Sequence, residues 1–253
     1  MVETGLQRRA RRALERQLDY QRCKAERVRG HEAEVIAGMV ERSVSVRKKL
    51  AAIRPLPSEA RVLEVGSGAH GLIFYFEAAD RVGVDPLADH YRALFPAWQG
   101  MARTVAAFGE DLPFENASFD IVMCDNVVDH AESPRRIVEE IARVLKPGGL
   151  LYFTVNFHHP FYQWAENAHS AWRAVGVPFE ITPFADHTVH LSLDAVRQLF
   201  AGLPLRVLSQ SDDMEETKRS GGRNKPARHL GDRLKRLFFK NARWEMIAER
   251  IAG

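Results

Sequence analysis

The sequence predicts an α/β fold: an open, mostly parallel sheet with helices on both faces, preceded by a helical N-terminal segment. The first observation is Arg61–Val65, a short apolar strand pattern that runs into a glycine-rich turn, Gly66–Gly71. The second is the apolar segment 72–79, which we expect to be a helix. Strand and helix patterns continue to alternate downstream, as they do in units of strand, crossover and parallel strand.

The glycine-rich turn predicts a binding site for a small molecule. Glycines at positions 66 and 68 let a ligand approach the main chain without a Cβ in the way. Because the expected helix begins at this turn, we also expect free backbone N–H groups in the turn. The spacing Gly66-x-Gly68-x-x-Gly71 also fits the fingerprint of dinucleotide-binding sites. Asp85, after the next strand, suits a ribose hydroxyl whether the ligand is a dinucleotide or another ribose-bearing molecule.

The amino-acid composition is that of an ordinary globular protein. The chain has 253 residues, of which 45% are hydrophobic and 27% charged, enough for one large domain with a sizeable core. The chain shows neither an apolar run of about 18 residues nor a secretory leader at Met1, so we expect a cytoplasmic protein without a membrane span. Cys23 and Cys124 are far apart in sequence, so we expect two reduced thiols.

Charge is unevenly distributed along the chain. Residues 1–54 carry a net +7, residues 55–211 a net −8 and residues 212–253 a net +4, which together give the +3 of the whole chain. Basic ends of this kind allow contact with an anionic substrate, a membrane surface or nucleic acid, although charge runs are more often solvated helix faces.

Two helices are predicted before the first strand. Residues 5–29 and a second segment from about 31 to Ile53 have apolar residues at helical spacing, and Arg54-Pro-Leu-Pro57 ends the second. We expect the second helix to bury a set of six residues. These are Val35, Ile36, Met39, Val40, Val44 and Leu50. We treat 1–54 as an N-terminal helical lid or cap, with coverage of a sheet edge as the alternative, and 55–253 as the main domain.

Later elements complete the sheet. The expected strands are 81–85, 104–107, 119–124, 150–156, 204–209 and 243–249, and the expected helices lie near 90–95, 134–145 and 193–201. Ser133 and Pro134 suit the start of the helix after the fourth strand, and Ser192 caps the last one. The polar run 212–229 is expected to be a mobile insertion, followed by a basic helix through Leu237 and Phe238.

Four sequence blocks together resemble a known family. Glu64 precedes the glycines where a dinucleotide site normally has an apolar residue; Glu110–Phe114, Ser118–Val122 and Arg143–Leu150 follow in order. Residues 60 to 156 thereby resemble the class I S-adenosylmethionine-dependent methyltransferases, in the methyltransferase type 11 branch that includes the ubiquinone-biosynthesis enzymes. The resemblance implies a Rossmann-like, seven-stranded sheet in the order 3-2-1-4-5-7-6, and S-adenosylmethionine as the cofactor.

The resemblance also implies which residues hold the cofactor. The set is Glu64, Gly66, Ser67, Gly68, Asp85, Pro86, Glu110, Asp111, Leu112, Cys124 and Asp125. Asp85 is expected to accept hydrogen bonds from the ribose hydroxyls, with capping of the next helix as the alternative. Most members have an Asp for the adenine amino group where this chain has Phe108. Either Glu110 replaces it, which we favour, or Phe108 and Leu112 hold adenine by apolar contact and a backbone carbonyl takes the hydrogen bond.

The expected catalytic base is His130, with Asp129 to orient it. Both residues follow the fourth strand. In the family, this edge of the sheet faces the donor methyl group, and some sugar and natural-product enzymes have two consecutive histidines at these positions. A hydroxyl acceptor needs a proton acceptor, and histidine suits that task near neutral pH. The alternative for His130 is a structural hydrogen bond. His158, His159 and His187 are secondary candidates, and we expect no metal site among the histidines of 157–190 because their spacing is unsuitable.

The predicted function is methyl transfer to oxygen or nitrogen of a small-molecule acceptor, such as a sugar or a tailored metabolite. A nucleic-acid partner is not expected, and the oligomeric state is open. The alternatives are a methyltransferase that docks RNA or a lipid headgroup on its basic ends, a non-catalytic partner subunit with the same fold, and, most remotely, a dehydrogenase.

Overall fold

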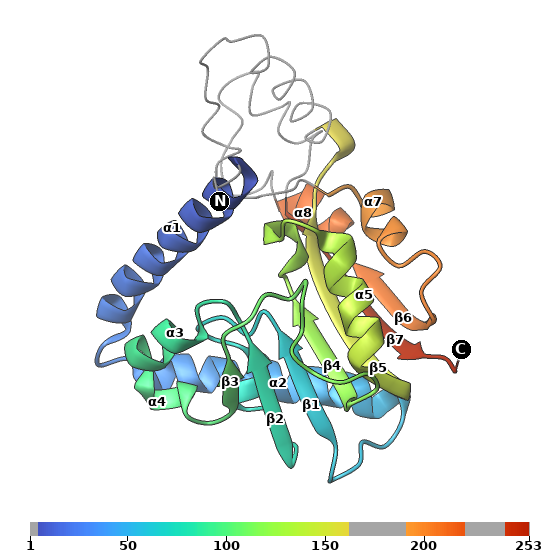
Figure 1. The fold of residues 1–253 in the computed structure, drawn as a ribbon, viewed down its shortest axis with the longest axis horizontal. Coiled ribbons are helices and arrows are strands. Elements are labelled where there is room, and N and C mark those ends of the chain that lie inside the picture. The colour runs from blue at the N-terminus through green and yellow to red at the C-terminus, as the bar shows by residue number, and fades with distance from the viewer. Residues whose placement is uncertain (1–4, 162–190, 221–240, 253) are drawn as a thin grey trace.

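The computed structural model describes residues 5–161, 191–220 and 241–252. They form one seven-stranded sheet, in the order β3-β2-β1-β4-β5-β7-β6, with helices on both faces (Figure 1). The strands are β1 (Arg61–Val65), β2 (Asp80–Val84), β3 (Arg103–Val105), β4 (Phe119–Asp125), β5 (Leu145–Phe157), β6 (Leu205–Asp212) and β7 (Ala242–Arg250). The predicted fold class and strand order are confirmed.

Two parallel pairings set the register at the centre of the sheet. Val65 at the end of β1 lies beside Val84 of β2 and Cys124 of β4. β3 and β5 extend the parallel part, and β7 runs antiparallel between β5 and β6. The carboxyl ends of β1, β2 and β4 therefore meet at one edge, where open sheets bind ligands.

Helices and short turns connect the strands. They are α1 (Gly5–Val28), α2 (Glu32–Ile53), η1 (Leu72–Phe74), α3 (Ala88–Leu94), α4 (Pro96–Gln99), η2 (Val128–His130), α5 (Pro134–Val144), α7 (Leu193–Gln198) and α8 (Met214–Ser220). Within the described ranges, no helix is long and apolar enough to cross a membrane.

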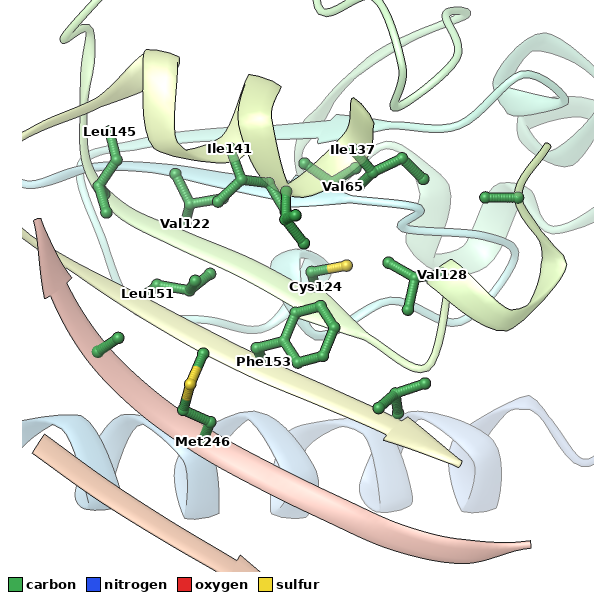
Figure 2. Close-up of a cluster of buried hydrophobic side chains, with 14 of the residues drawn as sticks. Val65, Val122, Cys124, Val128, Ile137, Ile141, Leu145, Leu151, Phe153 and Met246 are labelled. Atoms are coloured by element: carbon green, nitrogen blue, oxygen red, sulfur yellow. The ribbon is translucent and has the colours of Figure 1, made fainter. Parts of the chain in front are cut away.

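One face of the sheet is covered by α5 and α7. The apolar stripe of α5 packs on β1, β4 and β5 (Figure 2); Ile137 and Ile141 are no more than 2% exposed. Cys124 and Val128, on β4 and just after it, are buried in the same cluster, so this core continues to the carboxyl edge of the sheet.

The other face is covered by α2, which crosses the strands, and by α3 and α4 (Figure 1). The second core lies here and includes Leu50 of α2, Val62 of β1 and Trp98 of α4. Apolar residues of α1, among them Leu18 and Ala25, pack against this core. Residues 32–53 thus form a packed layer on a sheet face.

The structure corrects the expected helix after the glycine turn. Residues 72–74 form one 3-10 turn and no α-helix follows before β2, although a parallel crossover usually contains a longer helix. α2 covers this position instead: the Ser43 hydroxyl donates to the Leu72 carbonyl at 2.7 Å, and Arg47 Nε donates to the Glu77 carbonyl at 3.3 Å.

The buried set of α2 was predicted only in part. Met39 and Leu50 are buried as expected, but Val40 and Val44 are 37% and 41% exposed, while Ser43 and Val46 are buried instead. The hydroxyl of Ser43 tolerates burial because it finds the Leu72 carbonyl.

The expected mobile run 212–229 is also wrong in its first part. β6 continues to Asp212 and residues 214–220 form α8, whose start is supported by Asp212 Oδ1 accepting from Met214 N at 3.1 Å. Residues 221–229, and the basic helix expected at Leu237 and Phe238, lie outside the described residues.

Candidate functional site

The candidate site lies at the carboxyl edge shared by β1, β2 and β4. The glycine turn follows β1, Asp85 follows β2, and Asp125 ends β4. Because Val65, Val84 and Cys124 are register partners, these three features converge although they are up to 60 residues apart in sequence.

Backbone N–H groups of the glycine turn are used to hold the turn itself. Gly66 N and Ser67 N both donate to the Val84 carbonyl, at 2.7 and 3.0 Å, and Gly68 N donates to Asp85 Oδ2 at 3.0 Å. The expectation that these amides are free for a ligand is therefore wrong. β2 and its terminal carboxylate thus fix residues 66–68 of the turn.

Asp85 is held by two backbone groups. Its Oδ2 accepts from Gly68 N, and its Oδ1 accepts from Leu87 N at 2.9 Å. Burial raises the pKa of Asp85, and the two N–H donors oppose that increase. A carboxylate has about four acceptor positions, so each oxygen can still accept a hydroxyl donor. Pro86 follows directly and is partly exposed.

A side chain as small as a methyl group would fit on Gly68 without a clash. A Cβ built on this glycine would meet its nearest atoms, the Gly66 carbonyl and Asp85 Oδ2, only at 3.9 and 4.0 Å. The φ angle of Gly68 is +54°, a region that favours glycine. The Ser67 side chain is buried against Gly83 of β2, where a Cβ would come within 2.7 Å of its hydroxyl, so Ser67 is not part of this space. Room for a ligand beside Gly68 and a carboxylate with spare acceptor positions fit a ribose-bearing cofactor such as S-adenosylmethionine.

Glu64 points beneath the turn rather than into the open space. Its Oε1 accepts from Leu72 N at 3.1 Å and its Oε2 from Ile73 N at 2.9 Å, and the side chain is buried. Burial raises the pKa of Glu64 to about 8, against the opposing effect of the two N–H donors. Glu64 therefore holds the 3-10 turn that closes the glycine loop.

This pKa predicts a pH dependence of stability. The folded protein binds a proton at Glu64 up to about pH 8, whereas an unfolded Glu loses it near 4.5. The stabilisation that the bound proton provides is complete below pH 4.5 and is lost as pH rises through 8. In between, the free energy of unfolding falls by no more than about 1.4 kcal/mol per pH unit because of this group. We expect the advantage of the wild type over Glu64→Gln to shrink by about 2 kcal/mol between pH 5.5 and 7.5.

Denaturant unfolding of both proteins at the two pH values measures this difference. Because the two proteins are compared at each pH, the contributions of other groups that titrate in the same interval cancel. Glu59→Gln, which changes an exposed Glu, is the matched control and should show a constant difference. A constant difference for Glu64→Gln as well would contradict the raised pKa.

Two residues that sequence reasoning missed fasten the turn from α4. Trp98 Nε1 donates to the Ala69 carbonyl at 2.7 Å, and Gln99 Nε2 donates to the Gly68 and Ala69 carbonyls at 3.2 and 3.0 Å. Both side chains are about 1% exposed. The only signal in the sequence was Pro96, which starts this short helix.

The loop expected to receive adenine is partly occupied by its own contacts. Glu110 Oε1 lies 3.2 Å from Glu132 N and 3.4 Å from Ser133 N and accepts from both, just before α5. Leu112 is buried and its N donates to Glu140 Oε2, while Phe108 is 51% exposed and Asp111 is exposed. This geometry favours the apolar alternative for adenine over Glu110. Ser133 occupies the N-cap position of α5 as predicted, but its side chain makes no capping bond.

Asp125 is the centre of a charged group contributed by four elements. It accepts from Arg42 Nη2 of α2 at 2.5 Å, from Thr154 Oγ1 of β5 at 2.5 Å and from Arg243 Nη2 of β7 at 3.2 Å. Its neighbour Cys124 points to the opposite core and is buried, and burial raises the pKa of that thiol. Asp125 faces the site; the Cys124 side chain does not.

Asp129 and His130 lie together in η2, directly after β4. Asp129 Oδ2 is 3.7 Å from His130 Nε2; the carboxyl is fully buried and the imidazole is about half exposed. The two side chains are close but 3.7 Å exceeds a hydrogen-bond distance, so a direct hydrogen bond would need a small movement of the imidazole.

The other histidine candidates follow β5. His158 is 1% exposed and its Nδ1 accepts from Asn241 N at 3.0 Å, whereas His159 is partly exposed and its Nδ1 accepts from Phe161 N at 3.2 Å. His169, His187 and His190 lie outside the described residues. Among the described residues, no group of three or more His, Cys, Asp or Glu could hold a metal ion.

Parts of the chain are similar to known methyltransferases. Residues 63–153 match the family model described as a methyltransferase domain. An uncharacterized methyltransferase of Mycobacterium sp. (strain JLS) is 38% identical over 109 residues, 42% of this chain and 43% of that protein. The thiol S-methyltransferase TMT1B of Rattus norvegicus is 28% identical over 130 residues, 47% of this chain and 53% of that protein. The chain thus spans about half of the length of these relatives.

Among solved structures, a geranyl diphosphate methyltransferase in complex with S-adenosylmethionine has a similar fold, with a TM-score of 0.57 and 17% sequence identity, over 88% of this chain and 91% of that one. The family match falls on β1 to β5, the part of the sheet that forms the site. Residues 63–153 of the chain thus match a methyltransferase domain, and the fold is similar to that of solved methyltransferases.

Proposed function

We propose that this protein transfers a methyl group from S-adenosylmethionine to oxygen or nitrogen of a small-molecule acceptor. The observation that carries the proposal is the Asp85 carboxylate, which is fixed by Gly68 N and Leu87 N next to a glycine whose Cβ position is free of clashes. The match of residues 63–153 to a methyltransferase domain supports the cofactor, and the solved geranyl diphosphate methyltransferase of similar fold contains it.

The residues around the turn have separate tasks in this proposal. Asp85 accepts the ribose hydroxyls, and Gly68 leaves room for the cofactor beside the backbone. Leu112 and Phe108 cover adenine, and a backbone group completes its recognition. When bound, the cofactor supplies an activated methyl group on a sulfonium, so the protein needs only to align the acceptor and manage its proton.

His130 is the proposed base for an acceptor hydroxyl, and Asp129 orients its imidazole. The imidazole is accessible at the edge where β4 ends, and the buried Asp129 carboxyl stabilises the imidazolium that forms when His130 takes the proton. An amine acceptor would lose its proton to the same nitrogen.

Calorimetric titration with S-adenosylmethionine, S-adenosylhomocysteine and NAD tests the proposal before any acceptor is known. We expect micromolar binding of the first two and none of NAD. Methylation assays then follow with sugars, small phenols and amines; thiols belong in the set because one relative is named a thiol S-methyltransferase. Binding of NAD alone, or of none of the three, would contradict the proposed cofactor.

Asp85→Ala is expected to weaken S-adenosylhomocysteine binding at least tenfold, because hydrogen bonds to a carboxylate contribute roughly 1.5–3 kcal/mol. Isothermal titration measures the change. Asp80→Ala is the matched control: Asp80 begins the same strand at the opposite edge, where it pairs with Arg61 at 2.7 Å. An unchanged dissociation constant for Asp85→Ala, or equal losses in both variants, would remove Asp85 from the ribose site.

A further inference from the structure

The chain leaves β4 through a residue with an unusual backbone conformation. Asn126, the first residue after the strand, has a φ of +60°. This left-handed region is sterically unfavourable for residues with a Cβ, although asparagine adopts it more readily than most. Such a conformation persists where the surrounding structure holds it, and it is frequent at functional sites.

Two hydrogen bonds hold Asn126 against β5. Its backbone N donates to the Thr154 carbonyl at 3.0 Å, which continues the parallel ladder beyond the register pair of Asp125 with Thr154. Its side-chain Oδ1 accepts from Asn156 N at 3.0 Å, a bond that the backbone carbonyl would accept in a regular parallel ladder. The side chain therefore replaces the main chain in the ladder, and the backbone can turn out of the sheet.

The turn out of β4 directs the next residues toward the glycine turn. Val127 packs so closely on Gly66 that a Cβ on that glycine would lie 2.3 and 2.6 Å from its two methyl groups. Val128 and Asp129 are fully buried, and His130 N donates to the Val127 carbonyl at 3.0 Å, which closes η2. The path out of β4 therefore determines where His130 lies relative to the glycine turn.

Asparagine combines the two properties that position 126 requires. It tolerates the left-handed region, and its amide oxygen accepts a hydrogen bond without adding charge. Glycine would allow the same φ but leave Asn156 N without its acceptor, and alanine would meet neither requirement. Aspartate would meet both, but it adds a negative charge between Asp125 and Asp129 in the sequence. Each substitution therefore removes a different part of the arrangement.

We propose that Asn126 is a positioning residue for methyl transfer: its amide ties η2 to β5 and thereby orients the His130 imidazole toward the acceptor hydroxyl. The inference rests on the proposed function, in which His130 accepts the proton that this hydroxyl loses. Asn126 acts through η2 and not by contact with the reacting atoms. Without the bond to Asn156 N, the packing of Val127 and Val128 still holds the turn, but the imidazole is placed less precisely.

Kinetics of three variants, on an acceptor that the wild type methylates, test the role of the amide. We expect Asn126→Gly, which keeps the conformation and loses the bond to Asn156 N, to lower kcat about fivefold. Asn126→Ala also loses the conformation and should lower kcat more than about tenfold, whereas Asn126→Asp keeps the acceptor and should lose less than either. The dissociation constant of S-adenosylhomocysteine should stay within about twofold, because Asp85 is held independently by Gly68 N and Leu87 N.

Two comparisons separate the positioning of His130 from general damage to the structure. In a His130→Ala background, Asn126→Gly should lower kcat no further, because both changes act on one group. Asn241→Gly is the matched control and should keep the wild-type kcat: Asn241 has nearly the same φ, +61°, but bonds to His158 through its backbone N, which glycine retains. The same loss of kcat from Asn126→Gly in the His130→Ala background, or an equal loss of cofactor affinity, would overturn the inference.

A second arm needs no acceptor. The C–H signal of the His130 imidazole, identified in NMR spectra by its absence in His130→Ala, is recorded for the wild type, Asn126→Gly and Asn241→Gly. We expect it to shift or broaden in Asn126→Gly alone, and an unchanged signal in that variant would overturn the inference. If the wild type neither binds S-adenosylhomocysteine nor methylates an acceptor, the proposed function fails, and this signal alone decides whether Asn126 holds η2 and His130 in place.

Discussion

Replacing Gly66 by alanine is expected to lower the free energy of unfolding by about 2–5 kcal/mol. Two costs add up. Gly66 has a φ of +70°, where an alanine costs roughly 1–2 kcal/mol. A Cβ there would lie 2.3 and 2.6 Å from the two methyl groups of Val127, and forcing such an overlap in a packed region costs about 1–3 kcal/mol more.

Chemical denaturation of Gly66→Ala, Val127→Ala and the double variant measures the steric part. We expect Gly66→Ala to cost about 1–3 kcal/mol less when Val127 is already alanine, since the overlap is then gone and only backbone strain remains. An equal cost in both backgrounds would mean that the turn moves away from Val127 freely, contrary to its two bonds to the Val84 carbonyl.

Gly68→Ala is the matched comparison, because this glycine has a similar φ but open space around its Cβ position. Its expected cost in stability is only the strain of about 1–2 kcal/mol. Its expected effect on S-adenosylhomocysteine affinity is larger, more than tenfold, because the methyl group would occupy the space beside Asp85 that the cofactor needs. The opposite ranking of the two variants, with Gly68→Ala the less stable, would contradict the described turn.

The fold could be predicted because its determinants are local. Arg61–Val65 and Phe119–Asp125 are short apolar runs bounded by turn residues, and their length and flanks identify buried strands without tertiary information. The antiparallel β7 came from the family resemblance, and the structure places it between β5 and β6.

The errors lie at positions where tertiary packing, rather than the local sequence pattern, determines the structure. The apolar residues 72–79 predicted a helix, but α2 already covers that part of the sheet, and the chain needs only one 3-10 turn held by Glu64. Ser43 was not expected inside because its partner, the Leu72 carbonyl, is 29 residues away.

In the candidate site, too, the features set by local sequence could be predicted and those set by tertiary packing could not. Asp85 and the glycines were recognisable because their spacing is itself the motif. No periodicity shows that Trp98 and Gln99 hold the carbonyls of the turn, or that Arg42 and Arg243 meet at Asp125. Those contacts depend on how helices dock on the sheet, and a hydrophobic pattern alone does not specify which polar side chain reaches which loop.

His130→Ala is expected to reduce turnover about a hundredfold or more on an acceptor that the wild type methylates, because general-base catalysis typically contributes 10²–10⁴-fold. The dissociation constant of S-adenosylhomocysteine should stay within twofold, since the imidazole lies on η2 beyond β4 and away from Asp85. Steady-state kinetics and calorimetry on the same preparation give both numbers. His90→Ala, which changes an exposed histidine on α3, is the control for loss of an imidazole as such.

Asp129→Asn separates the orienting role of the carboxylate from the base itself. The substitution keeps the shape of the buried side chain but removes the charge that stabilises an imidazolium 3.7 Å away. We expect a smaller loss of turnover than for His130→Ala, about tenfold, and little further loss when the two substitutions are combined, because both act through one group. Independent, multiplying losses would show that Asp129 does not work through His130. A loss of cofactor affinity equal to the loss of turnover in His130→Ala would instead identify the imidazole as a structural element at the end of β4.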